Sequence, residues 1–113
     1  MGMLIYDGTS LPFDDRTLTH LQIVIVQKFS RNEAFLMSWK DSPSVGDGRS
    51  AIWLTPTMPL QFKFLGGKVP TIDRDWLELL GKSAESSTGL LITHADGKLA
   101  LVGADGPYPG MVR

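Results

Sequence analysis

The chain of 113 residues has the length of one domain, and its 42% hydrophobic and 20% charged residues are typical of a folded protein. Eleven Lys and Arg stand against twelve Asp and Glu, so the net charge of −1 supplies no large field toward nucleic acid or acidic membranes. The absence of cysteine excludes disulfides, thiolate metal sites and a cysteine nucleophile. Because we find no leader-like start and no apolar run near the roughly 20 residues that span a bilayer, we expect a cytoplasmic protein.

The first predicted elements are a short strand and a long helix. Residues 3–6 form an apolar run that ends at the turn pair Asp7-Gly8, which predicts a strand. Residues 9–13 lead into a helix over residues 14–30, for which Asp14 or Asp15 is the expected N-cap. Helical spacing gathers the expected core-facing side chains of this helix: Leu18, Leu21, Ile25 and Phe29.

Three strands are predicted after this helix. Residues 34–40 and 60–65 alternate between inward and outward side chains, and residues 49–54 form the strand between them. The loop over residues 41–48 is rich in Pro, Gly, Ser and Asp, which favours a long hairpin. The expected inward side chains of the two alternating strands are Phe35, Met37, Trp39, Leu60, Phe62 and Phe64.

The last predicted elements are a second helix and a terminal hairpin. Asp73 is the expected N-cap of an amphipathic helix from Arg74 to about residue 86. Residues 90–93 and 98–102 bracket a turn and predict the hairpin.

The predicted order is therefore β-α-β-β-β-α-β-β. This order indicates an α+β fold in which a largely antiparallel sheet carries two helices packed on one face. We expect a single domain over residues 1–102, followed by a flexible tail over residues 103–113. The Gly and Pro content of that tail opposes regular structure.

No motif in the sequence predicts catalysis or a resident cofactor. His20 and His94 are the only histidines, and neither lies at a metal-ligand spacing. His20 falls on the helix face that we expect to meet solvent. No G-x-S-x-G elbow occurs, so nucleophilic hydrolysis is not indicated either. The sequence favours a protein that is not an enzyme and holds neither a metal nor a cofactor.

Aromatic and basic residues are mixed along neighbouring predicted strands. They are Trp39, Trp53, Phe62, Phe64, Lys40, Arg49 and Lys63. Sheet surfaces that stack single-stranded bases use such a mixture. Lys63, however, alternates with Phe62 and Phe64, so we interpret the aromatic residues as core and the cations as solvent-facing.

A resemblance to a known family covers most of residues 14–90. The chain is similar to short uncharacterised actinobacterial proteins in the segments DDRTLTHLQIVIVQKFSRNEAFLMSW, GDGRSAIWLTPTMPLQFKF and DRDWLELLGKSAESSTGL. Relatives of that kind are sometimes labelled ATP-dependent DNA ligase. Such a ligase needs Lys-x-Asp-Gly, whereas the residues two positions before the Asp-Gly pairs here are Ile5, Val45, His94 and Gly103. The resemblance thus implies a shared fold and an accessory role near DNA, without ligase catalysis.

Three functional hypotheses follow. The first is favoured because residues 1–102 are well patterned for folding while no motif predicts catalysis. The first is a non-enzymatic interaction module that binds a protein partner or a second copy, with no membrane contact. Its expected contact surface is Arg16, Thr19, His20, Ile23 and Gln27. The second is a weak nucleic-acid-binding accessory protein related to DNA metabolism. Expected anion or nucleic-acid contacts are Lys28, Arg31, Lys40, Gly46, Gly48, Arg49 and Lys63. The third is an enzyme for a small phosphorylated ligand held by Gly46, Gly48 and Arg49.

Overall fold

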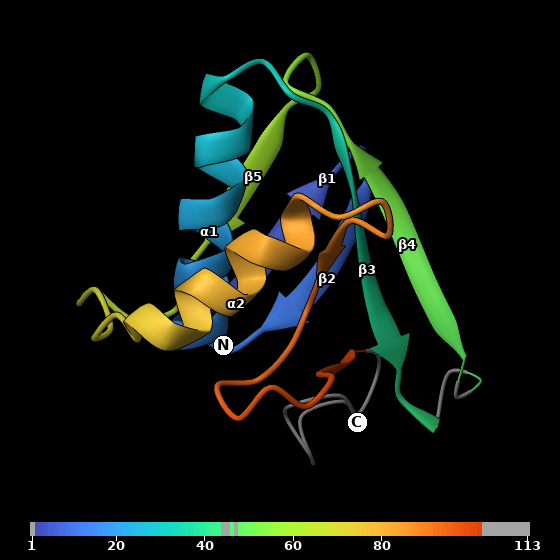
Figure 1. Cartoon of the computed structure of the whole chain (residues 1–113). Coiled ribbons are helices and arrows are strands. Elements are labelled where there is room, and N and C mark those ends of the chain that lie inside the picture. Colours follow the sequence, from blue (N-terminus) through green and yellow to red (C-terminus); the bar gives the residue numbers. More distant parts are fainter. Residues whose placement is uncertain (1, 44–45, 47, 103–113) are drawn as a thin grey trace.

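The computed structural model describes residues 2–43, 46 and 48–102, and its elements are shown in Figure 1. In chain order they are β1 (Gly2–Tyr6), β2 (Thr9–Phe13), α1 (Asp15–Ser30), β3 (Phe35–Asp41), β4 (Arg49–Leu54), β5 (Leu60–Lys63), α2 (Arg74–Ala84), β6 (Leu90–Leu91) and β7 (Leu101–Val102). The predicted α+β class and the predicted order are confirmed, and the structure adds β2. The predicted tail over residues 103–113 lies outside the described residues.

The first sheet contains β1, β2 and β5 in the antiparallel order β2-β1-β5. The turn pair Asp7-Gly8 joins β1 to β2 with positive φ angles of 47° and 81°, as a type I′ hairpin turn requires. β2 carries Pro12 and lies at the edge of the sheet, where a missing N–H is tolerated. Residues 9–13 therefore form a strand although the sequence predicted only a connection there.

The second sheet is built around β3, in the order β4-β3-β6 with β7 also paired to β3. β3 and β4 form the predicted antiparallel hairpin, whereas β6 and β7 run parallel to β3. The predicted terminal hairpin closes at one antiparallel bridge between Thr93 and Leu99. The fold is thus largely antiparallel, but its strands are divided between two sheets.

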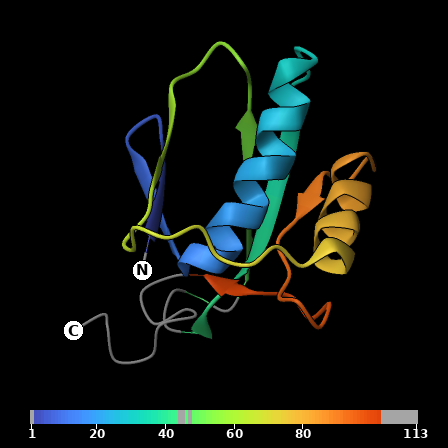
Figure 2. The same cartoon turned by 90° about the vertical axis from the view of Figure 1, so that its left-hand side faces the viewer.

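α1 lies between the β1–β2–β5 sheet and α2 (Figure 2). Its predicted core residues Leu18, Leu21 and Ile25 are fully buried, and Phe29 packs partly buried at the margin of the core. Asp14 is the N-cap, because its carboxylate accepts hydrogen bonds from the backbone N–H and the hydroxyl of Thr17. Neither helix in the described part of the chain is long and apolar enough to cross a membrane.

The face of α1 that we expected to meet solvent is partly covered by α2. His20 is fully buried, and Thr19 is buried with its hydroxyl bonded to the backbone oxygen of Asp15. The exposure predicted for these two residues is wrong, and His20 is covered by Trp76 of α2, which stacks on its ring. Arg16 and Gln27 remain exposed and Ile23 is half-buried, so that part of the predicted contact surface stays a prediction.

The His20 ring joins α1 to the start of α2. Its Nδ1 lies 2.7 Å from the backbone oxygen of Arg16, and Asp73 N–H donates to Nε2 at 2.8 Å. The Trp76 indole stacks on the ring with centroids 4.4 Å apart. Both ring nitrogens are satisfied when Nδ1 carries the proton. Asp73 also caps α2 as predicted, by accepting a bond from the backbone N–H of Trp76.

Candidate functional site

The candidate site is the face of the β3–β4–β6 sheet that points away from α1. Strand alternation places Phe35, Met37 and Trp39 of β3 in the core, so the intervening residues of β3 point to the other side. Residues directly opposite each other in an antiparallel pair share a face, and the register pairs Leu36 with Trp53, Ser38 with Ala51 and Lys40 with Arg49. We call these six residues, together with Leu91 of β6, the outer sheet face.

Trp53 is the most conspicuous residue of the outer sheet face. Its side chain is 59% exposed, whereas Trp39 and Trp76 are 6% and 3% exposed. Its backbone oxygen accepts a 2.6 Å hydrogen bond from the Tyr6 hydroxyl, which fixes this end of β4 next to β1. A large aromatic side chain that is held on a rigid strand and open to water is typical of binding surfaces.

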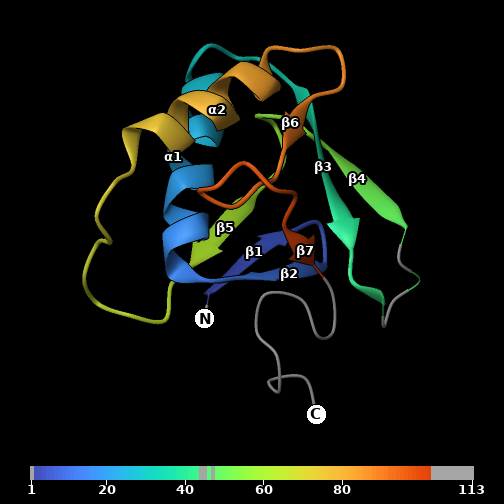
Figure 3. The same ribbon diagram turned by 60° about the horizontal axis from the view of Figure 1, so that its bottom comes forward.

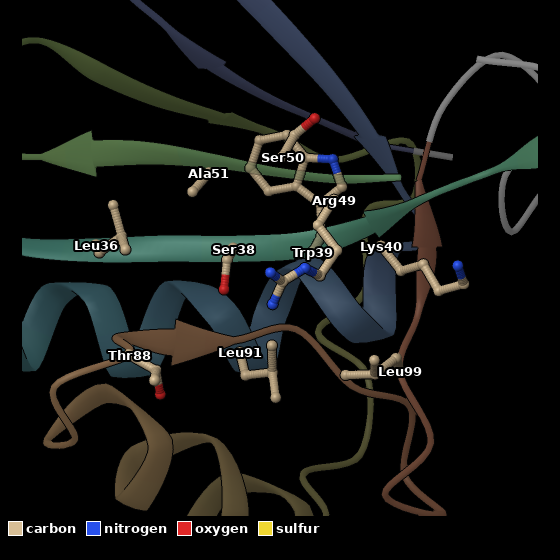
Figure 4. Close-up of a pocket in the computed structure, with 10 residues that line it drawn as sticks. All are labelled: Leu36, Ser38, Trp39, Lys40, Arg49, Ser50, Ala51, Thr88, Leu91 and Leu99. Atoms are coloured by element: carbon tan, nitrogen blue, oxygen red, sulfur yellow. The ribbon is translucent and has the colours of Figure 1, made fainter. Parts of the chain in front are cut away.

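An open hollow of about 660 Å³ lies over the outer sheet face (Figure 4). Leucines from three segments line it, with Leu36 and Thr88 at one end and Lys40 and Leu99 at the other. The other lining residues are Ser38, Trp39, Arg49, Ser50, Ala51 and Leu91. The hollow therefore combines an apolar floor with two cations, Lys40 and Arg49, which face each other across the strand pair.

This geometry belongs to a chain that matches a known domain family. The model of the family described as Domain of unknown function (DUF7882) matches residues 1–95. The chain belongs to this family. No curated protein and no solved structure matches it. The DUF7882 match includes all residues of the outer sheet face and ends before Leu99 and β7.

Within this DUF7882 domain, the predicted anion contacts do not form one patch. Lys40 and Arg49 are brought together on the outer sheet face, whereas Lys63 lies on β5 in the other sheet. Lys28 and Arg31 lie at the end of α1. The fold therefore brings two of these cations to one surface and separates the others from it.

Lys28 is a buried cation that is paired with two carboxylates. Its side chain is 10% exposed, and its Nζ lies 2.5 Å from a Glu85 oxygen and 3.0 Å from a Glu33 oxygen. The hydrogen bond that Lys28 donates to the Glu85 carboxylate raises the pKa of Lys28, and the same bond lowers the pKa of Glu85. Lys28, which we expected to contact an anion or nucleic acid, is paired with two carboxylates of the chain itself, and the pair with Glu85 ties the end of α1 to the end of α2.

The loop that we weighed as an anion cradle closes the β3–β4 hairpin. Gly46 has a φ of 112°, and the Gly48 oxygen accepts a 2.9 Å hydrogen bond from the backbone N–H of Asp41. The Asp41 carboxylate accepts from the Ser50 hydroxyl at 2.9 Å, so a negative group stands at the base of this loop. Residues 44, 45 and 47 lie outside the described part. Among the residues that the structure does describe, no group of three or more His, Asp or Glu side chains is placed to hold a metal.

The face assigned to Trp53 is the main correction at this site. We interpreted the aromatic residues as core, which holds for Trp39 and for the partly buried Phe62 and Phe64. For Trp53 the interpretation is wrong, because β4 places Trp53, Ala51 and Arg49 together on the outer sheet face. The available signal was the two-residue spacing of Arg49, Ala51 and Trp53, which puts a cation and an aromatic ring on one side of a strand.

Proposed function

We propose that this member of the DUF7882 family is a non-enzymatic interaction module. Its outer sheet face binds a protein segment that carries apolar side chains next to an acidic group. The observation that supports this proposal is Trp53, exposed on the same face as Arg49 and Lys40 and beside the leucine-lined hollow. Trp and Arg are the residues most enriched among those that dominate binding energy, and Leu36 and Leu91 supply the apolar surround.

Single-stranded nucleic acid is the second candidate, because Trp53 and two cations share one face after all. It is less favoured than a protein partner. The rest of the outer sheet face and of the hollow is mainly aliphatic, and one exposed ring gives a stacking platform for few bases. The net charge of −1 also supplies no general attraction to a polyanion.

A peptide selection tests the proposed function. The immobilised protein is offered a displayed library of random peptides, and the enriched sequences are synthesised and titrated by calorimetry. We expect enriched peptides to combine apolar residues with Asp or Glu. Trp53→Ala should weaken their binding about 30-fold, which corresponds to a hot-spot loss of about 2 kcal/mol. Arg49→Glu should also weaken peptide binding, and by a larger factor at low salt than at high salt.

Leu65→Ala is the matched control, because Leu65 is an exposed apolar residue that follows β5, a strand of the other sheet. It should bind the selected peptides as the wild type does. Enriched peptides that bind Trp53→Ala and Arg49→Glu unchanged would refute the proposed site. Salt-sensitive binding of an oligothymidylate that depends on Trp53, with no peptide enrichment, would instead establish the nucleic-acid candidate.

A further inference from the structure

The outer side of β4 is an open strand edge. β4 pairs with β3 and with no other strand of the described chain. Asp41 shows which residues of the β3–β4 pair are hydrogen-bonded, because its backbone N–H donates to the Gly48 oxygen at 2.9 Å. In an antiparallel pair, hydrogen-bonded and non-hydrogen-bonded residues alternate. Ser50, Ile52 and Leu54 therefore direct their backbone groups to β3.

The remaining residues of β4 direct their backbone groups away from the sheet. They are Arg49, Ala51 and Trp53. The Tyr6 hydroxyl supports this phase, because it reaches the Trp53 oxygen from outside the β3–β4 ladder. Open edges of this kind are usually protected by charged side chains, prolines or bulges. β4 has one such residue, Arg49, at its first position and carries Ala51 and Trp53 after it.

We infer that β4 pairs antiparallel with β4 of a second copy of this chain, about a two-fold axis at Ala51. This inference goes beyond the proposed function, because it concerns the strand edge and names a partner for it, and either proposal can fail without the other. At the axis the two Ala51 residues lie opposite each other, where their small side chains avoid a clash. Each hydrogen-bonded pair across the new ladder exchanges two backbone bonds.

The sequence of β4 is self-complementary in this register. Two positions on either side of Ala51, Arg49 of one copy lies opposite Trp53 of the other copy, and the symmetry repeats the contact. Directly opposite side chains are on the same face, so each guanidinium meets an indole on the outer sheet face. The Trp53 oxygen has a second lone pair for the new bond beside the one that Tyr6 uses.

Neighbouring registers are less suitable. An axis at Arg49 would set two guanidinium groups directly opposite each other, which is destabilising. An axis at Trp53 would bring the second strand against Tyr6, which occupies that end of the edge. Of the three registers, only the one centred on Ala51 places a cation opposite an aromatic ring. It also joins the two outer sheet faces into one continuous surface.

Sedimentation equilibrium over a wide range of protein concentration tests the inference. The wild type should reach twice the monomer mass of 12.4 kDa as concentration rises. Ala51→Pro removes an N–H from the edge without touching the β3 ladder, and should be monomeric. Ala51→Lys places two cations at the axis on an exposed position and should also be monomeric, which covers the case in which the proline variant fails to fold.

Two further variants sharpen the test. Ala95→Lys adds the same charge in an exposed turn and should dimerise as the wild type does. Arg49→Glu should weaken dimerisation about tenfold through the two lost cation–π pairs. A monomer at every concentration, or unchanged dimerisation of Ala51→Lys and folded Ala51→Pro, would overturn the inference. A monomer that still selects acidic apolar peptides refutes the dimer alone, whereas a dimer that selects none refutes the proposed function alone.

Discussion

Replacing His20 with Phe tests how α2 is fastened to α1. The phenyl ring keeps a flat aromatic surface against Trp76, whose ring centroid lies 4.4 Å from that of His20. It removes the Nε2 acceptor, so the backbone N–H of Asp73 loses its 2.8 Å hydrogen bond in a part-buried position. An unsatisfied buried donor costs about 1–3 kcal/mol, and we expect the free energy of unfolding to fall by that amount.

Urea unfolding followed by tryptophan fluorescence measures this change. In thermal unfolding, a loss of that size should lower the melting temperature of a 113-residue chain by about 4–12 °C. His94→Gln is the control, because His94 lies beside an exposed turn, and its effect should stay within about 0.5 kcal/mol. A His20→Phe variant as stable as the wild type would show that the bond to Asp73 does not hold the two helices together.

Three other predictions concern backbone space and charge. Gly89→Ala should lower the free energy of unfolding by at least about 2 kcal/mol, because Gly89 has a φ of 82° and a Cβ there would strike a backbone oxygen of β3. Gly81→Ala, which has open space around it in α2, should raise the free energy of unfolding by about 0.5–1 kcal/mol. Equal melting temperatures of the two variants would contradict this reasoning. Glu85→Ala should lower the urea midpoint more than Lys28→Met does, because it leaves a buried ammonium with only one carboxylate. The reverse order would show that the ion pair behaves as an exposed surface pair. Two backbone N–H groups after β5 donate to the Asp15 carboxylate and hold its pKa below the ordinary 3.8, so the stabilising effect of Asp15 is complete above pH 3.8 and is lost as the pH falls through the lowered value. Urea unfolding at several pH values should show the stabilities of the wild type and Asp15→Asn converging in acid. A constant difference between them would refute the assignment.

Local signals in the sequence predicted the elements well. Asp14 is the N-cap out of the two candidates that the sequence offered, Asp73 is the cap that it predicted, and β3 buries Phe35, Met37 and Trp39 as its alternation indicated. Each of these features depends on residues within a few positions of one another. Such features are readable because capping and strand alternation act within one turn of helix or one short strand.

Long-range packing was not readable in the same way. His20 is buried by residues of α2, and its bond to Asp73 joins positions 53 apart in the chain. A helical wheel of α1 shows polar residues on that side and contains no sign of what covers them. The buried pairing of Lys28 with Glu85 has the same origin, because the partner is 57 positions away. Both corrections follow from one event, the docking of α2 on α1.

The misplacement of Trp53 has a different physical cause. In β4 the inward set Ser50, Ile52 and Leu54 and the outward set Arg49, Ala51 and Trp53 each contain apolar residues, so alternation alone does not say which set is buried. Packing in the common hydrophobic core settles the choice by burying Leu54 fully, which leaves Trp53 in water. An exposed indole that the core does not need contributes little to folding. Its removal should therefore leave the free energy of unfolding nearly unchanged while weakening binding at the outer sheet face about 30-fold, which separates a functional from a structural role for Trp53.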